Sequence, residues 1–222
     1  MSQMNVWDAN DEYIHTHLVG EPQAFAQATK DMRTTNMPHM EVSPAQGKFL
    51  YLLAKVQGAK RILEIGTFYG YSTMWFAKAL PEDGLVVSME LTPKFVAAAT
   101  ENVKAANLEH KVRLVNEDAH IYMKQLIQEG CEPFDIIFID AHKPSYPAYL
   151  ELALALSKTG TIIIGDNIIL DGELANEANP HPKATKVRAF VEALGENKRL
   201  ESTALQTVGV KGYDGFTMSV VL

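Results

Sequence analysis

Short apolar runs alternate with longer amphipathic ones along most of the chain. Five of these runs, rich in Ile, Val, Leu and Phe, predict strands at 61–65, 85–90, 111–117, 134–140 and 161–166. Their apolar residues are nearly continuous, which is typical of parallel strands that are buried on both faces. The segments between them have helical periodicity. The pattern therefore predicts an α/β fold with an open, doubly wound sheet built from βαβ units.

The two ends of the chain depart from this alternation. A helix is expected at about 183–195, and two strand-like runs follow at 201–208 and 215–222. Their short, Gly-rich connector allows only an antiparallel pair. The seven-stranded, mostly parallel sheet should therefore finish with an antiparallel C-terminal edge strand. Residues 1–57 contain no strand pattern and are predicted to form a helical segment beside or over the core of residues 58–222.

Composition and charge favour a single domain over residues 1–222. The chain carries 20 Lys and Arg against 27 Asp and Glu, a net charge of −7, and no Pro/Gly/Ser-rich linker divides it. The acidic balance argues against nucleic acid as a partner, and no apolar stretch approaches the ~20 residues of a membrane span. The single cysteine, Cys131, suits a reducing compartment, and the polar N-terminus is not a signal peptide, so a cytoplasmic location is expected.

A glycine turn, EIGTFYGYS, follows the first predicted strand. Ligands of open α/β sheets bind at the carboxyl ends of the strands, which makes this turn a candidate cofactor site. Gly66 and Gly70 permit a tight turn, with a helix beginning near Ser72. The G-x-x-x-G spacing differs from the G-x-G-x-x-G of nicotinamide and flavin binders, so a nicotinamide oxidoreductase is disfavoured. An ordinary strand-to-helix turn is the alternative explanation.

Acidic residues end the next two strands. Glu90, after the second strand, is placed to accept hydrogen bonds from ribose hydroxyls. Asp118 and Ala119 follow the third strand, where an adenine edge would lie in such a site. A solvated strand end is the alternative for Glu90.

Oxygen ligands end the fourth and fifth strands. Asp140 ends one, and Asp166 with Asn167 ends the other. Neighbouring strand ends lie about 4.8 Å apart, so these side chains can converge. Two carboxylates and an amide suit Mg²⁺, with Ca²⁺ or Mn²⁺ as alternatives, rather than zinc. Helix capping is the alternative role for each Asp taken singly. Lys143 is placed to reach a substrate hydroxyl, and a nearby cation with partial desolvation would favour its neutral, basic form.

In order, these motifs resemble those of the cation-dependent S-adenosylmethionine O-methyltransferases, which include the catechol and caffeoyl-coenzyme A enzymes and their bacterial relatives. The shared order is E-I-G-T-x-x-G-Y-S, an acidic end to the second strand, D-A, F-I-D-A-x-K and G-D-N. It covers the chain from about Met40 to the C-terminus. The resemblance implies a Rossmann-like class I methyltransferase fold, S-adenosylmethionine as cofactor and a divalent cation.

The resemblance also implies roles for individual residues. The residues implied to contact the cofactor are Val42, Glu64, Gly66, Thr67, Ser72, Glu90, Asp118, Ala119 and Asp140. The implied metal ligands are Asp140, Asp166 and Asn167, and the implied general base is Lys143. His142 stands where the mammalian catechol enzyme has a tryptophan, which leaves the substrate open. Residues 167–183, rich in Gly, Asn, Asp and Pro, are expected to form a lid-like loop over the site.

The sequence thus predicts metal-dependent methyl transfer from S-adenosylmethionine to a hydroxyl of a vicinal dihydroxy aromatic. Two alternatives stay open. One is a methyltransferase of the same fold that acts on a monohydroxylated small molecule and holds only a structural metal. The other is a regulatory protein that binds the cofactor without turnover. A homodimer is also expected, because apolar residues such as Val6, Tyr13 and Leu18 have no sheet face left to cover them.

Overall fold

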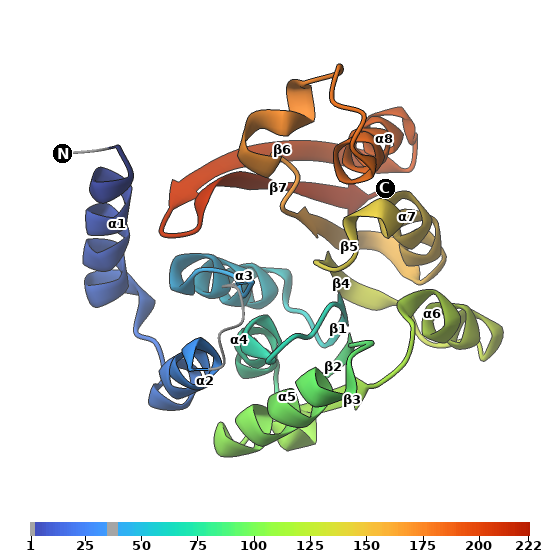
Figure 1. The fold of residues 1–222 in the computed structure, drawn as a ribbon. Coiled ribbons are helices and arrows are strands. Elements are labelled where there is room, and N and C mark those ends of the chain that lie inside the picture. The colour runs from blue at the N-terminus through green and yellow to red at the C-terminus, as the bar shows by residue number, and fades with distance from the viewer. Residues whose placement is uncertain (1–2, 35–39) are drawn as a thin grey trace.

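A seven-stranded sheet forms the centre of the computed structural model, which describes residues 3–34 and 40–222 (Figure 1). The strand order is β3-β2-β1-β4-β5-β7-β6. The strands are β1 (Arg61–Ile65), β2 (Leu85–Met89), β3 (Val112–Val115), β4 (Phe134–Ile139), β5 (Ser157–Asp166), β6 (Leu200–Gly209) and β7 (Gly212–Val221). β1 to β5 are parallel, and β7 runs antiparallel to both of its neighbours. The predicted doubly wound α/β sheet is confirmed.

Helices cover both faces of the sheet. They are α1 (Gln3–Ile14), α2 (Gln23–Arg33), α3 (Pro44–Gln57), α4 (Tyr71–Ala79), α5 (Pro93–Ala105), α6 (Ala119–Gln128), α7 (Tyr146–Ala155) and α8 (Pro182–Glu196). Short helical turns lie at η1 (His15–Val19), η2 (Glu109–Lys111), η3 (Lys143–Ser145) and η4 (Leu170–Ala175). In Figure 1, α3, α4 and α5 lie on one side of the sheet and α6, α7 and α8 on the other.

Each face of the sheet has its own hydrophobic core. On β4, Ile136 and Phe138 pack into the core under α3 and α4, whereas Ile137 and Ile139 pack into the core under α6, α7 and α8. All four side chains are fully buried. This arrangement explains the continuous apolar pattern of the central strands, because every position of such a strand faces a core.

The C-terminal hairpin corrects one detail of the predicted sheet. The antiparallel pair is confirmed, but the reversed strand β7 lies between β5 and β6, and β6 forms the edge. Most of β6 is exposed, while every position of β7 is buried or half-buried. The more apolar of the two runs therefore takes the inner place, where it buries more surface.

The N-terminal segment is helical, as predicted. Phe25 of α2 is buried against Trp75, with ring centroids 5.1 Å apart. Val6, Tyr13, Ile14 and Leu18 remain exposed in this single chain. Among residues 3–34 and 40–222, no helix is both long and apolar enough to cross a bilayer.

The turn after β1 brings two strand ends into close contact. The Asp140 amide donates to the Ile65 carbonyl at 2.9 Å, and Gly66 adopts a φ of 101°. A Cβ atom at Gly66 would lie 2.0 Å from the Asp140 carbonyl oxygen. Only glycine fits this turn, for steric reasons and for its backbone conformation.

Gly66→Ala is therefore expected to destabilise the fold by more than about 2 kcal/mol, through combined strain and overlap. Gly195→Ala is the control, because Gly195 lies in α8 and a methyl group added to it would meet no atom within 4 Å. That change should stabilise the helix by about 0.5–1 kcal/mol. Denaturant unfolding measures both, and equal stabilities of the two variants would refute the close packing at Gly66.

Candidate active site

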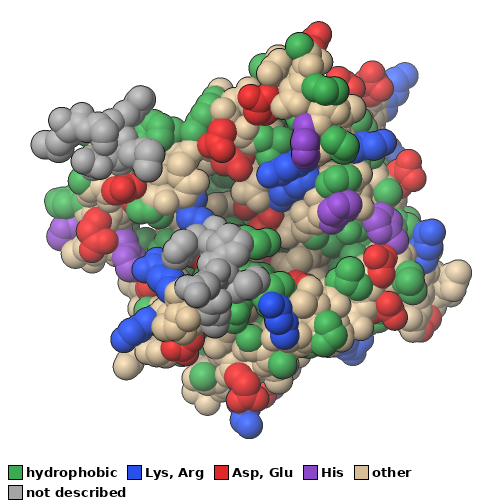
Figure 2. Space-filling model, in the orientation of Figure 1, with side chains coloured by type: hydrophobic (Ala, Val, Ile, Leu, Met, Phe, Trp, Pro, Cys, Tyr) green, Lys and Arg blue, Asp and Glu red, His purple; other side chains and the backbone are tan. Residues whose placement is uncertain are grey.

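A cavity of about 1380 Å³ opens at the carboxyl ends of the strands. Figure 2 shows this face hollowed at its centre, with Lys, Arg and His side chains around the hollow. The cavity lining includes most of the predicted site residues, namely Val42, Gly66, Thr67, Ser72, Glu90, Asp118, Ala119, Asp140, Lys143, Asp166 and Asn167. The structure therefore gathers residues from five strand ends and the N-terminal segment around one space.

Glu64 is the predicted site residue that does not line the cavity. Its buried carboxylate accepts hydrogen bonds from Ser72 Oγ at 2.5 Å, from Ser88 Oγ at 2.6 Å and from Thr73 Oγ1. Burial raises the pKa of Glu64 to about 7, although the three hydroxyls oppose the shift. Of the three hydroxyl residues, only Ser72 borders the cavity. Glu64 lies behind Ser72 and can orient its hydroxyl.

Glu90 stabilises the turns that follow β1 and β2 through two backbone contacts. Its Oε2 accepts from the Phe68 amide at 3.0 Å, and its Oε1 accepts from the Thr92 amide at 2.9 Å. Phe68 has a φ of 48°, an uncommon conformation that the Glu90 contact supports. Each carboxylate oxygen keeps a second lone pair for a ligand. Asp118 similarly caps α6 by accepting from the His120 amide at 2.8 Å while it borders the cavity.

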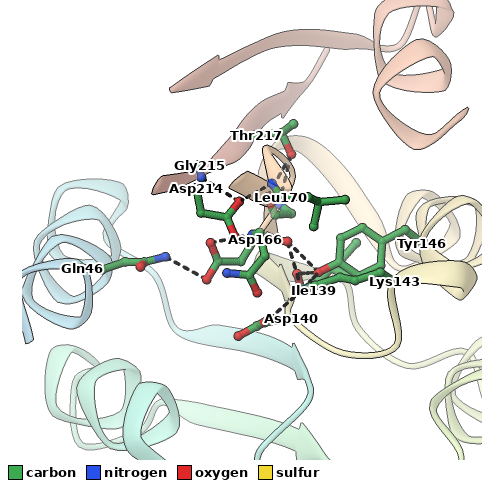
Figure 3. Close-up of polar contacts among 12 residues, drawn as sticks. Gln46, Ile139, Asp140, Lys143, Tyr146, Asp166, Leu170, Asp214, Gly215 and Thr217 are labelled. Atoms are coloured by element: carbon green, nitrogen blue, oxygen red, sulfur yellow. Dashed lines mark hydrogen bonds and ion pairs between the residues drawn. The ribbon is translucent and has the colours of Figure 1, made fainter. Parts of the chain in front are cut away.

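Lys143 lies beside Tyr146, Asp140 and Asp166 in the polar cluster shown in Figure 3. Its Nζ donates to Asp140 Oδ1 at 2.8 Å, to the Tyr146 hydroxyl at 2.6 Å and to the Asp166 carbonyl at 3.1 Å. The residue is only 8% exposed. Three acceptors therefore fix the direction of the amine, and its short helical turn η3 places it beside the Asp140 carboxylate and the Asp166 backbone.

Asp166 is the most buried of the candidate metal ligands. Its Oδ2 accepts from Gln46 Nε2 at 2.8 Å, and its Oδ1 accepts from the Asn167 amide at 2.9 Å. Burial and, to a smaller extent, the neighbouring charge of Asp140 raise the pKa of Asp166 to about 7. Two carboxylates that disfavour each other's ionisation are stabilised by a cation bound between them.

The donor set fits a hard divalent cation. Asp140, Asp166 and Asn167 all border the cavity, and their carboxylate and amide oxygens are the ligand type that Mg²⁺ and Ca²⁺ prefer. In the described ranges, no group of three or more His, Cys, Asp and Glu side chains is arranged to hold a metal. A site here would therefore need the Asn167 amide as its third protein oxygen.

Three polar residues of this site were missed from the sequence. The Tyr146 hydroxyl accepts a hydrogen bond from Lys143, and Gln46 donates one to Asp166 (Figure 3). The third residue is Asp214, whose Oδ1 accepts from the amides of Ile169, Leu170 and Gly215. Burial raises the pKa of Tyr146 well above its usual value, so its hydroxyl stays protonated. Gln46 and Asp166 are 120 residues apart, and no local pattern signals such a contact.

The loop predicted over the site covers it only at its two ends. At one end of the loop Asn167 borders the cavity, and at the other end His181 and Lys183 do so. The middle of the loop is tied to α8 instead, because Arg188 donates to the carbonyls of Asn176 at 3.0 Å and Asn179 at 2.7 Å.

Comparison with known proteins gives a consistent result. Residues 15–220 match the O-methyltransferase family. The chain is 44% identical over 216 residues to the catechol O-methyltransferase of Niastella koreensis, which covers 97% of this chain and 98% of the relative. It is 37% identical to the catechol O-methyltransferase of Mycobacterium tuberculosis, over 95% of this chain and 94% of the relative.

Solved structures agree with these sequence relatives. The O-methyltransferase of Bacillus cereus in complex with SAH has a TM-score of 0.96 at 43% identity, covering 99% of this chain and 100% of that one. The O-methyltransferase TomG of Streptomyces achromogenes in complex with SAM has a TM-score of 0.96 at 39% identity, covering 100% and 99%. The chain therefore belongs to the O-methyltransferase family, as its motifs predicted, and its sheet is that of a class I methyltransferase.

Proposed function

We propose that this enzyme transfers a methyl group from S-adenosylmethionine to a hydroxyl of a catechol-type aromatic. Two similar proteins are catechol O-methyltransferases, and two similar structures hold SAH or SAM. The observation that carries the proposal is the cluster of Lys143, Asp140 and Asp166 on the wall of one cavity. A basic side chain beside two carboxylates is suited to acid–base chemistry on a hydroxyl.

The cofactor would occupy the part of the cavity bordered by the turns after β1, β2 and β3. Glu90 would accept hydrogen bonds from the ribose, while Asp118 and Ala119 would border the adenine. Gly66, Thr67, Ser72 and Val42 would contact the methionine portion, with Asp140 beside it. Glu64 would act through Ser72, because it lies behind that hydroxyl.

Asp140, Asp166 and Asn167 would hold a divalent cation, with Mg²⁺ as the first choice. When bound, the cation would supply the positive charge that favours loss of a proton from a substrate hydroxyl. Lys143 would accept that proton at Nζ. An amine that takes up a proton keeps two N–H donors, so two of the three acceptors around Nζ can orient it while its lone pair receives the proton. The cavity walls would hold the hydroxyl oxygen near the methyl donor.

Glu90→Ala is expected to weaken binding of S-adenosylmethionine by roughly 1.5–3 kcal/mol, the usual contribution of a charge-assisted hydrogen bond. The loss of its contacts to the Phe68 and Thr92 amides adds to this effect, because the turn becomes less ordered. Calorimetric titration measures the affinity. Glu101→Ala, at an exposed position of α5, is the control. Unchanged affinity of the Glu90 variant would remove the ribose assignment.

The homodimer remains a proposal that rests on the exposed apolar side chains of the N-terminal segment. Val6 is 44% exposed, Tyr13 69% and Leu18 72% in the single chain. A second copy that covers them would gain the free energy of apolar burial. Sedimentation at micromolar concentration should give twice the monomer mass, and a monomer would contradict the proposal.

The experiment that tests the function is a methyl-transfer assay with radiolabelled S-adenosylmethionine over catechols and matched monophenols. Label should pass to a catechol hydroxyl and much less to a monophenol. Equal transfer to both would favour the alternative in which a monohydroxylated molecule is the substrate. Tight cofactor binding without any transfer, over a broad panel of phenols, would favour the regulatory protein that binds without turnover.

A further inference from the structure

We propose that the substrate end of this cavity selects catechols that carry an anionic substituent over those that carry a cationic one. This inference rests on the proposed function and deepens it by naming the substrate class. It comes from the distribution of charge and apolar surface beyond Asp140 and Asp166, in the part of the cavity that the cofactor residues do not border.

One wall of this region is apolar. It is formed by Met40 and Phe49 of the N-terminal segment and by Leu205, Val208 and Phe216 of the β6–β7 hairpin. The rings of Phe49 and Phe216 lie 5.3 Å apart in a tilted pair. An aromatic ring gains most from contact with such a surface, so the substrate ring is expected against this wall.

The lining of the same cavity also includes two imidazoles and one ammonium group. His142 comes from the segment after β4, while His181 and Lys183 come from the start of α8. All three side chains are exposed and border the same cavity. Figure 2 shows such Lys, Arg and His side chains at the rim of the hollow. A substituent on the ring would meet these groups as it points away from the apolar wall.

The histidines here are oriented by local contacts. His181 Nδ1 accepts from the Lys183 amide at 3.2 Å, so its ring proton is on Nε2, the nitrogen that is left to donate. His142 Nδ1 lies 3.1 Å from Ser145 Oγ. Within the part of the chain that the structure describes, Lys183 forms no ion pair with a carboxylate. Its charge is therefore available to a ligand.

The acidic residues of the same region are already engaged with the protein. Asp11 Oδ2 accepts from the Val210 amide at 2.9 Å. Glu41 lies 3.3 Å from Lys211 in an ion pair. Asp214 accepts from three backbone amides through one oxygen. Backbone amides stabilise the Asp11 and Asp214 carboxylates in place, and Lys211 balances the charge of Glu41, so Lys183 is the cation that a ligand at the rim can pair with. The whole chain has a net charge of −7, which makes this a local feature rather than a general property of the surface.

A carboxylate on the ring would thus gain hydrogen bonds and attraction, whereas an ammonium would be repelled. Each partly exposed charge of this kind contributes a few-fold in affinity, and salt screens it. Reversing one such charge replaces attraction by repulsion, which corresponds to about a tenfold change in preference.

Three catechols with different side chains test the inference: 3,4-dihydroxyphenylacetate, 4-methylcatechol and dopamine. The wild-type kcat/KM should be at least about tenfold higher for the acid than for the amine, with the neutral compound between them. Lys183→Glu should lower this ratio by at least about tenfold, and Lys183→Met by at least about threefold, because the acid loses and the amine gains. Comparing variants cancels the different intrinsic reactivities of the three rings.

Lys186→Glu is the matched control, because it makes the same charge change at an exposed position of the same helix that does not border the cavity. It should leave the ratio within about twofold. Equal shifts in Lys183→Glu and Lys186→Glu, or equal wild-type efficiencies for the acid and the amine, would overturn the inference while leaving the proposed function intact. If none of the three compounds is methylated, both the proposed function and this inference are contradicted.

Calorimetry gives a second readout that does not depend on turnover. With SAH and Mg²⁺ present, Lys183→Glu should weaken binding of 3,4-dihydroxyphenylacetate by about threefold to tenfold and leave 4-methylcatechol unchanged. Equal losses for both ligands would show a distorted cavity rather than a charge contact, and would overturn the assignment of Lys183.

Discussion

Lys143→Met is expected to lower the turnover number by about 10²–10⁴ while S-adenosylmethionine binding stays close to wild type. This is the typical contribution of a positioned general base. Methionine keeps an unbranched side chain, one atom shorter, but cannot accept the proton of a substrate hydroxyl. Lys143 borders the cavity through an amine held by Asp140, Tyr146 and the Asp166 carbonyl, and no cofactor role is assigned to it.

Lys158→Met is the control for this variant. Lys158 lies 2.6 Å from Asp135 in an ion pair at the opposite end of the sheet, so the same atoms are removed far from the cavity. Single-turnover methyl transfer and calorimetric cofactor titration measure the two quantities separately. Near-wild-type turnover of Lys143→Met at neutral pH would place the base elsewhere.

Asp166→Ala should lower methyl transfer by at least about 10², and excess Mg²⁺ should not restore it. Loss of one of three protein oxygens leaves a weakly held ion. Even removing a residue that only hydrogen-bonds to a metal ligand lowers metal affinity or activity about 10- to 100-fold. The fold should persist, because Asp166 lies at the end of β5, a strand held on both faces by apolar cores.

Glu177→Ala, an exposed change in the loop that follows Asp166, is the matched control and should keep full activity. Circular dichroism checks the fold of both variants. An Asp166→Ala enzyme that regains wild-type turnover at high Mg²⁺ would show that Asp166 is dispensable as a ligand.

The fold was predictable wherever burial leaves a simple pattern. The run at 61–65 coincides with β1 (Arg61–Ile65), because both faces of this strand are covered and each position must be apolar or paired. β5 begins four residues earlier than predicted, at Ser157, since its first positions are polar and half-buried or exposed. The place of β7 inside the sheet was not predictable from connector length, which fixes pairing direction but not the order of strands.

The candidate site was predictable for residues that sit directly at strand ends. Asp140 directly follows β4 and Asp166 is the last residue of β5; the two strands are neighbours in the sheet, and both residues border the cavity. Gln46 and Asp214 come from other parts of the chain and meet this region through tertiary packing alone. The burial of Glu64 behind Ser72 also depends on the helix α4 that covers it, which the motif by itself does not specify.

The central claim is that catalysis needs a divalent cation while folding does not. It is tested most directly by methyl transfer to a catechol before and after removal of divalent ions with a chelator, with circular dichroism recorded in parallel. Activity should fall to background, the spectrum should stay nearly unchanged, and Mg²⁺ should restore turnover while Zn²⁺ does so poorly, since zinc prefers nitrogen and sulfur donors in a tetrahedral site. Full activity in excess chelator would contradict the metal-dependent account and favour a mechanism in which Lys143 acts alone.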